Sequence, residues 1–410
     1  MGAGQEVLIV PVPGPSCLSK EKLQIALRVR DRMIAELTQT NRRDNFLALL
    51  GEMLGDAELK IDRIAVVLET LHSEYVGVGR SWTWDEGTKT HFMRHGDARR
   101  EYLESPFAFA MESGDWLLLN LDETSDEAFP IVADLKARGY VQHLTIPLRY
   151  SNGSSNAVSF ATGVPDSFNE DAFALLGIVI PTLTLVMELL STRYRVENML
   201  RTYVGNEPRQ EILSGTIRRG QVTRIRSAIL FSDMRDYTRI SARLSPEETV
   251  EFLDSYFDCI VPCVEDNGGE VLKYIGDGVL AIFRDYGNDT GSAAYSALEA
   301  AMESLEMIER ANQDGRFKTP VSIGIALHHG EAAYGNVGSG SRLDFTVVGP
   351  DVNLASRLAR MNRVLREPLL TTRAFANQLW YELEYIGSHA IQGLDEPLDI
   401  FRPPKHADDF

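Results

Sequence analysis

Cysteine and positive charge are both scarce in this sequence. Only three of the 410 residues are cysteine, Cys17, Cys259 and Cys263. An odd number with no metal-like clustering argues against a disulfide framework and favours a reducing, cytoplasmic environment. Lysine and arginine total 41 against 59 acidic residues, which gives a formal net charge of -18. Because no basic stripe is present to bind a phosphate backbone, we expect no nucleic acid partner.

Long uncharged runs are also few. The N-terminal run at residues 7–15 lacks a basic flank and is too short and proline-rich for a signal peptide. The run Ala172–Met187 carries no charge, but it falls short of the roughly 18 to 20 apolar residues that a bilayer requires. Glu170, Asp171 and Glu188 flank it without basic anchors. We therefore expect a buried or dimer-forming helix and no membrane span.

The pattern of the sequence changes along its length and indicates several domains. The composition, 44% hydrophobic and 24% charged, is that of an ordinary globular protein that can bury more than one core. We expect a multidomain α+β and α/β chain. Its predicted parts are an N-terminal irregular segment and helix (1–45), a region of alternating strands and helices (46–190), a helical linker (191–221), a C-terminal domain (222–403) and a tail (404–410).

The region 46–190 contains the string I-P-L-R-Y-S-N-G-S-S-N-A-V-S-F-A-T, followed by S-F-N-E-D-A-F-A-L-L. On these residues the region resembles a GAF sensor domain. The resemblance implies an antiparallel-sheet domain that binds a small molecule and regulates the C-terminal domain. The ligand stays unknown, because the N-K-F-D-E signature of cyclic-nucleotide-binding members is missing and no cysteine is present for a bilin. The linker 191–221 either transmits a change between dimer partners or is a passive spacer.

Two aspartates end apolar runs in the C-terminal domain. Asp233 follows the predicted strand Ile225–Ser232. Asp277 lies in a Gly-Asp-Gly turn between the predicted strands Glu270–Ile275 and Val279–Phe283. A β-α-β-β-α-β order places the hairpin beside the first strand, so the two carboxylates can converge. Oxygen ligands at strand ends suit Mg²⁺ or Mn²⁺, and two such ions about 3.5–4 Å apart favour displacement at phosphorus.

Three spaced motifs then identify a family resemblance. F-S-D-M-R-D-Y-T, K-Y-I-G-D-G and F-T-V-V-G-P-D-V-N-L-A-S-R-L are similar to the catalytic core of class III nucleotidyl cyclases. The resemblance covers the region 222–403 and implies a ferredoxin-like (βαββαβ) fold. It also implies that a nucleoside triphosphate is converted to a 3′,5′-cyclic nucleotide and pyrophosphate, with two Mg²⁺ or Mn²⁺ ions per site and a homodimer as the active form.

The family implies a role for each matching residue. Asp233 and Asp277 would bind both metal ions. Asn353 and Arg357 lie four apart on one helical face and would orient the ribose and stabilise charge on the α-phosphate. In the family these two come from the protomer opposite the aspartates. Backbone N–H groups just past Asp233 would bind phosphate oxygens. Those groups belong to Met234, Arg235, Asp236, Tyr237 and Thr238.

Lys273 and Thr346 stand where the family reads the purine. Adenine has an acceptor at N1 and a donor at N6, which suit a lysine donor and a threonine hydroxyl acceptor. Guanylyl members carry an acid in place of the lysine, so Lys273 favours ATP. The Lys and Thr pair resembles the class IIIb subgroup, some of whose members respond to bicarbonate. Two alternatives stay open: a guanylate cyclase, and a signalling module that binds nucleotide or a partner without turnover.

Two positions depart from the family pattern. Gln392 stands where a lysine often contacts the triphosphate, and we expect Arg342 to carry part of that role. Asp236 replaces a common glycine and adds negative charge beside the predicted phosphate site. Neither change removes a metal ligand or Arg357, but both are expected to raise KM.

Overall fold

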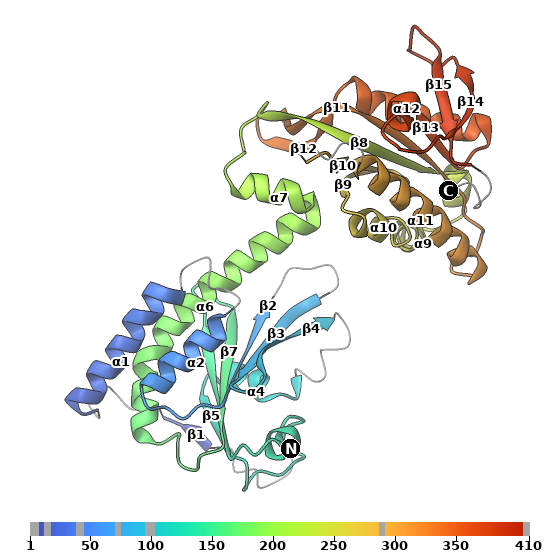
Figure 1. Ribbon diagram of the computed structural model, residues 1–410. Helices are drawn as coiled ribbons and strands as arrows, with labels where there is room; N and C mark the ends of the chain where they lie inside the picture. The colour runs from blue at the N-terminus through green and yellow to red at the C-terminus, as the bar shows by residue number, and fades with distance from the viewer. Residues whose placement is uncertain are drawn as a thin grey trace. The chain divides into compact units, whose positions relative to one another are not determined.

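The chain forms two compact units, Met1–Thr202 and Tyr203–Phe410, and each has its own β-sheet (Figure 1). Cys259 and Cys263 are buried free thiols, whereas Cys17 lies outside the described residues. The computed structural model describes residues 8–11, 18–37, 45–69, 75–94, 103–286 and 292–404.

An antiparallel seven-stranded sheet organises the N-terminal unit, with the spatial order β1-β5-β6-β7-β2-β3-β4. Neighbouring strands pair antiparallel throughout this order. Alternation of side chains along each strand gives the sheet two apolar faces to bury. The strands are β1 (Leu8–Val10), β2 (Arg63–Glu69), β3 (Tyr75–Thr83), β4 (Gly87–Arg94), β5 (Trp116–Asn120), β6 (Gln142–Arg149) and β7 (Ser155–Thr162).

Helices cover both faces of this sheet. On one face, Leu50 and Leu176 pack with Ile146 and Phe160 in a core from which water is excluded. On the other face, Leu119 packs in a smaller cluster with residues of the shorter helices. The helices are α1 (Lys20–Arg32), continued by the π-helix η2 (Met33–Leu37), then α2 (Phe46–Asp56), α4 (Pro106–Ser113), α5 (Val132–Ala137) and α6 (Glu170–Val204).

The uncharged run of the sequence lies in α6, a continuous helix of 35 residues. Leu176, Val179 and Leu183 are fully buried against the sheet, whereas Leu185 is 66% exposed. Within the described part of the chain, α6 is the one helix long and apolar enough to cross a membrane, with a window of mean hydropathy 2.2 that is 50% buried. A core helix passes the same test, and the expected burial is present on the face that meets the sheet.

The C-terminal unit is built on an eight-stranded sheet with the order β14-β15-β13-β11-β8-β10-β9, and β12 pairs with β11. Its central part follows the chain order β8, α9, α10, β9, β10, α11, β11, which is the predicted βαββαβ arrangement. The strands are β8 (Val222–Met234), β9 (Glu270–Ile275), β10 (Gly278–Arg284), β11 (Ile323–Ser339), β12 (Arg342–Val348), β13 (Leu369–Thr372), β14 (Glu384–His389) and β15 (Leu398–Arg402).

The helices of this unit also lie on two faces (Figure 1). Tyr256 of α9 and Ala297 of α11 pack with Leu230 of β8 on one face. Leu358 of α12 packs with Ala326 of β11 on the other. The helices are α7 (Asn206–Leu213), α8 (Tyr237–Ser241), α9 (Pro246–Phe257), α10 (Val261–Asp266), α11 (Ser292–Gln313), α12 (Pro350–Leu365) and α13 (Arg373–Ala376).

Candidate active site

The two aspartates predicted to bind metal lie next to each other. β8 pairs antiparallel with β10, with Ser232 opposite Val279, so the end of β8 meets the turn that carries Asp277. The backbone N–H of Met234 donates to Asp277 Oδ2 at 3.1 Å. Desolvation of the carboxyl, followed by the neighbouring charge of Asp277, raises the pKa of Asp233 to about 6. The predicted convergence of the two carboxylates is confirmed.

This pair fits a divalent cation. Two carboxylates held together repel each other, and a hard cation that prefers oxygen ligands removes the repulsion. Among the residues that the structure describes, no group of three or more His, Cys, Asp or Glu side chains is arranged to hold a metal. Any ion that Asp233 and Asp277 hold would therefore also need water or substrate oxygens as ligands, as Mg²⁺ commonly requires.

The loop after Asp233 is held by backbone hydrogen bonds. Besides the bond from Met234 to Asp277, the N–H of Arg235 donates to the carbonyl of Ser322 at 2.8 Å. The Arg235 bond extends the pairing of β8 with β11, which continues to Met234 opposite Ile323, whereas Met234 bonds to the side chain in the β9–β10 turn. The predicted phosphate-binding set at 234–238 is therefore corrected in this structure: only its last three members, Asp236 to Thr238, are left for a phosphate.

Asp236, the departure from glycine, adopts the left-handed backbone conformation, with φ 58°. Glycine enters this region without a steric cost, which gives a physical reason for its frequency at this position in the family. The Asp236 carboxylate lies 3.6 Å from Arg363 and 3.9 Å from Arg239. Its negative charge beside the predicted phosphate site is thus partly offset by two arginines.

Of the predicted base-reading residues, Lys273 on β9 bonds to Asp344 of β12, the strand that carries Thr346. The Lys273 ammonium donates to Asp344 Oδ2 at 2.7 Å. Asp344 and Thr346 are two apart on the strand and so share one face. The hydrogen bond from Lys273 lowers the pKa of Asp344 below its usual value, and the charge of Arg342 adds a smaller effect. Thr346 is 7% exposed, so its hydroxyl is largely shielded from water.

Asn353 and Arg357 lie on α12, which begins at Pro350 directly after β12. Asn353 is exposed, and Arg357 is half-buried. An Arg357 N–H donates to the carbonyl of Gly393, in the turn that also contains Gln392. This turn thus holds the Arg357 guanidinium in place. Gln392 in the same turn has no positive charge, unlike the lysine that is common at this position in the family.

The cyclase family is now identifiable by comparison with known proteins. Residues 222–369 match the family described as the adenylate and guanylate cyclase catalytic domain. The C-terminal unit contains a class III cyclase catalytic domain. An adenylate cyclase from Anabaena cylindrica is 34% identical to this chain over 188 residues, which are 44% of this chain and 37% of the relative. Adenylate cyclase 1 of Rhizobium meliloti (strain 1021) is 32% identical over 179 residues, covering 42% of this chain and 26% of the relative.

The chain spans well under half the length of these curated relatives. Among solved structures, the adenylyl cyclase CyaB from P. aeruginosa aligns with a TM-score of 0.42 and 24% sequence identity. That alignment covers 46% of this chain and 98% of the other.

In a single cyclase domain, the predicted residues fall into two groups. Asp233 lies at the end of β8 and Asp277 lies in the turn between β9 and β10. Asn353 and Arg357 lie on α12. Across the described part of the chain, no hydrogen bond or ion pair joins either aspartate to Asn353 or Arg357. Arg342 opens β12 at the far end of that strand from α12. Sequence reasoning missed Asp344, although an acid two residues before Thr346 and on the same strand face was a usable signal.

Proposed function

We propose that the chain is an adenylate cyclase that converts ATP to 3′,5′-cyclic AMP and pyrophosphate. The observation that carries this proposal is the contact between the loop of Asp233 and the carboxylate of Asp277, in a domain of the cyclase family. When bound there, two Mg²⁺ or Mn²⁺ ions would lower the pKa of the ribose 3′-hydroxyl and neutralise the departing pyrophosphate. Both relatives described above are named adenylate cyclases, which supports ATP as substrate.

Different residues of the chain would contact the base, the ribose and the α-phosphate. Lys273 would donate to N1 of adenine while Asp344 holds its ammonium, and the Thr346 hydroxyl would accept from N6. Asn353 would orient the ribose. Arg357 would donate to the α-phosphate oxygens as negative charge grows there, a role for which a planar guanidinium is suited.

The triphosphate would lie against the loop after Asp233. The N–H groups of Asp236, Tyr237 and Thr238 would donate to its oxygens. Arg342 would supply a cation in place of the lysine that Gln392 replaces. The arginines beside Asp236 reduce the repulsion that its carboxylate would otherwise exert on the phosphates.

We infer that the active form is a homodimer with shared sites. The aspartates of one chain would meet Asn353 and Arg357 of the other. In support, no hydrogen bond or ion pair among the described residues of one chain joins the two groups. The N-terminal unit would regulate this cytoplasmic enzyme as a GAF-like sensor of an unknown small molecule, which its antiparallel sheet between helices supports. Helix α6 leads to α7, whose first N–H donates to Glu270, three residues before Lys273, so α7 contacts the base-reading strand.

The test is the product formed by the purified protein. ATP or GTP is incubated with Mg²⁺ or Mn²⁺, and the products are separated by chromatography, with Asp233→Ala protein as the control. Formation of 3′,5′-cyclic AMP by the parent alone supports the proposal. Cyclic GMP as the main product would favour a guanylate cyclase, and no cyclic nucleotide with either metal would favour a silent binding module.

A further inference from the structure

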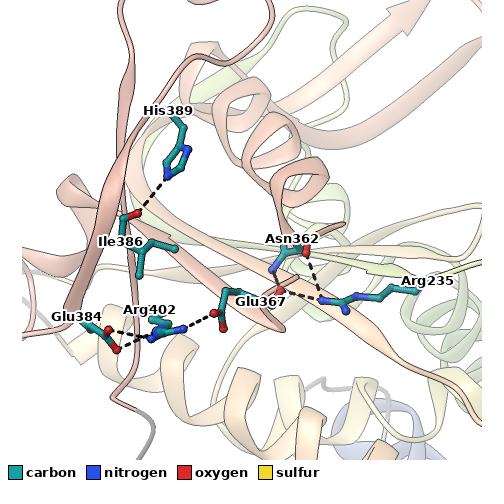
Figure 2. A network of polar contacts seen from close by, with 7 residues as sticks. All are labelled: Arg235, Asn362, Glu367, Glu384, Ile386, His389 and Arg402. Carbon is teal, nitrogen blue, oxygen red and sulfur yellow. Dashed lines mark hydrogen bonds and ion pairs between the residues drawn. The ribbon is translucent and has the colours of Figure 1, made fainter. Parts of the chain in front are cut away.

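Arg235 follows the metal aspartate by two residues, yet its side chain does not face the phosphate site. Its guanidinium donates to the carbonyl of Glu367 at 2.9 Å and to that of Asn362 at 3.3 Å. Figure 2 shows this side chain reaching the C-terminal end of α12. The role predicted for Arg235 from its N–H group thus gives way to a role for its side chain.

Arg235 binds one carbonyl of the last turn of α12, that of Asn362, and one just beyond the helix, that of Glu367. The last four carbonyls of an α-helix have no partner within the helix, and a cation near them is favourable. α12 ends at Leu365, and the next residue, Arg366, takes the left-handed conformation with φ 58°. Asn362, which is 2% exposed, donates its side-chain amide to the carbonyls of Ile325 and Glu367, both at 3.0 Å. The half-buried Arg235 side chain therefore completes a cap whose centre, Asn362, is buried.

The same cap is joined to the rest of the sheet. Glu367 forms an ion pair with Arg402 of β15, and Arg402 also pairs with Glu384 of β14 at 2.8 Å (Figure 2). Glu367 and Arg402 are both mostly buried. The end of α12 is thus anchored on one side by β14 and β15 and on the other by the loop that begins at Asp233.

Asn353 and Arg357 lie on the same helix as Asn362, nine and five residues earlier. A regular α-helix is a stiff rod, so its two ends move together. We propose that Arg235 is a positioning residue that fixes the orientation of α12 and, through it, of Asn353 and Arg357. The inference rests on the proposed function: in a dimer with shared sites, this link would run from the metal half of one site to the transition-state half of the other.

A heterodimer isolates this link. In a dimer of one Asp233→Ala chain and one Arg357→Ala chain, the intact site takes its aspartates from the second chain and its α12 from the first. Arg235→Ala is then added only to the Asp233→Ala chain, whose own metal loop is already disabled. The readouts are kcat and KM for ATP of the single intact site.

If Arg235 positions α12, kcat of that site falls roughly ten-fold while KM for ATP changes less than about three-fold, because a small misplacement of a catalytic group costs rate more than binding. Unchanged kcat would overturn the inference, since Arg235 would then act only on its own loop. Arg310→Ala, an exposed arginine of α11, serves as the matched control in the same chain and should leave kcat unchanged.

The Arg235→Lys variant and the dimerisation of the Arg235→Ala variant separate a positioning role from a folding defect. Arg235→Lys retains the charge and a donor for one carbonyl, so it should recover part of the lost kcat; no recovery in a folded, dimeric Lys variant would count against the inference. If the Ala variant fails to dimerise, the Lys variant alone decides the matter: a reduced kcat supports the link, and a parental kcat refutes it. A parent heterodimer without activity would instead overturn the shared-site proposal itself.

Discussion

The Lys273 ammonium lies 2.7 Å from the Asp344 carboxylate, although 71 residues separate the two in the chain. The pair joins β9, which leads into the turn of Asp277, to β12, which leads into α12. Lysine has three N–H donors, so its ammonium can hold Asp344 and still donate to a purine. The ion pair therefore holds the Lys273 ammonium at one place beside β12, where it is proposed to read the base.

Replacing Asp344 tests that relationship. Asp344→Asn removes the charge that holds Lys273, so KM for ATP should rise roughly three- to ten-fold, as expected for the loss of about one kcal/mol of binding. Steady-state kinetics at saturating metal measures the change. Asp314→Asn, which removes a carboxylate from the turn after α11, is the control. A KM that stays at the parental value would show that Asp344 does not position the lysine.

Arg357 should act on rate rather than on binding. Arg357→Ala removes a donor that matters most when charge develops on the α-phosphate, so kcat should fall by about a hundred-fold or more with little change in KM. Arg357→Lys keeps the charge but loses the planar fork, and it should recover only part of kcat. A variant that raised KM while keeping kcat would instead indicate a ground-state contact.

The aspartate pair should bind a divalent ion without substrate. Mg²⁺ or Mn²⁺ should raise Tm of the parent, because a ligand that binds only the folded state stabilises it, and excess EDTA should reverse the shift. Asp277→Asn removes one charged ligand and should abolish most of the shift while leaving the protein folded. An equal metal-dependent shift in parent and variant would place the binding elsewhere.

Glu270 predicts a pH dependence of stability in the C-terminal unit. Burial raises its pKa to about 7, the charges of Glu207 and Glu265 add to this, and N–H groups of Asn206 and Glu207 oppose it. Between the ordinary value near 4.5 and about 7, the folded state keeps a proton that the unfolded state has released. Stability should therefore fall as pH rises through this window, by about 1–3 kcal/mol in total.

Urea unfolding of the parent and of Glu270→Gln at several pH values measures this effect. The glutamine keeps an oxygen to accept from the Asn206 N–H, which lies 2.6 Å from Glu270 Oε1. The variant should lose the part of the pH slope that Glu270 contributes and gain relative stability at pH 8. Identical slopes for both proteins would contradict the assigned proton.

Local pattern and the expected strand order together predicted the aspartate pair. A glycine-flanked turn between two apolar runs predicted the hairpin of β9 and β10, and strand pairing then determined where Asp277 would lie. Asn353 and Arg357 were equally accessible, since a spacing of four places them on one helical face. The geometry of Asn353 and Arg357 is set by residues close together in sequence, whereas the approach of Asp277 to Asp233 also requires β10 to pair with β8.

Contacts between distant segments were not predictable in this way. The ion pair of Lys273 with Asp344 and the cap of α12 by Arg235 depend on how strands and helices far apart in sequence pack. Contacts with distant segments also changed the prediction for the loop after Asp233. Its first two N–H groups were predicted to face phosphate, but the continuation of β8 past Ser232 commits them to Asp277 and Ser322.

The most direct test of the account is complementation between two inactive chains. Asp233→Ala and Arg357→Ala chains, each inactive alone, are co-expressed with different tags, and the heterodimer is isolated and assayed for cyclic AMP. We expect about half of the parental activity, because one of the two sites in the heterodimer is intact. A purified, stable heterodimer without activity would contradict the claim that each chain supplies half of a site.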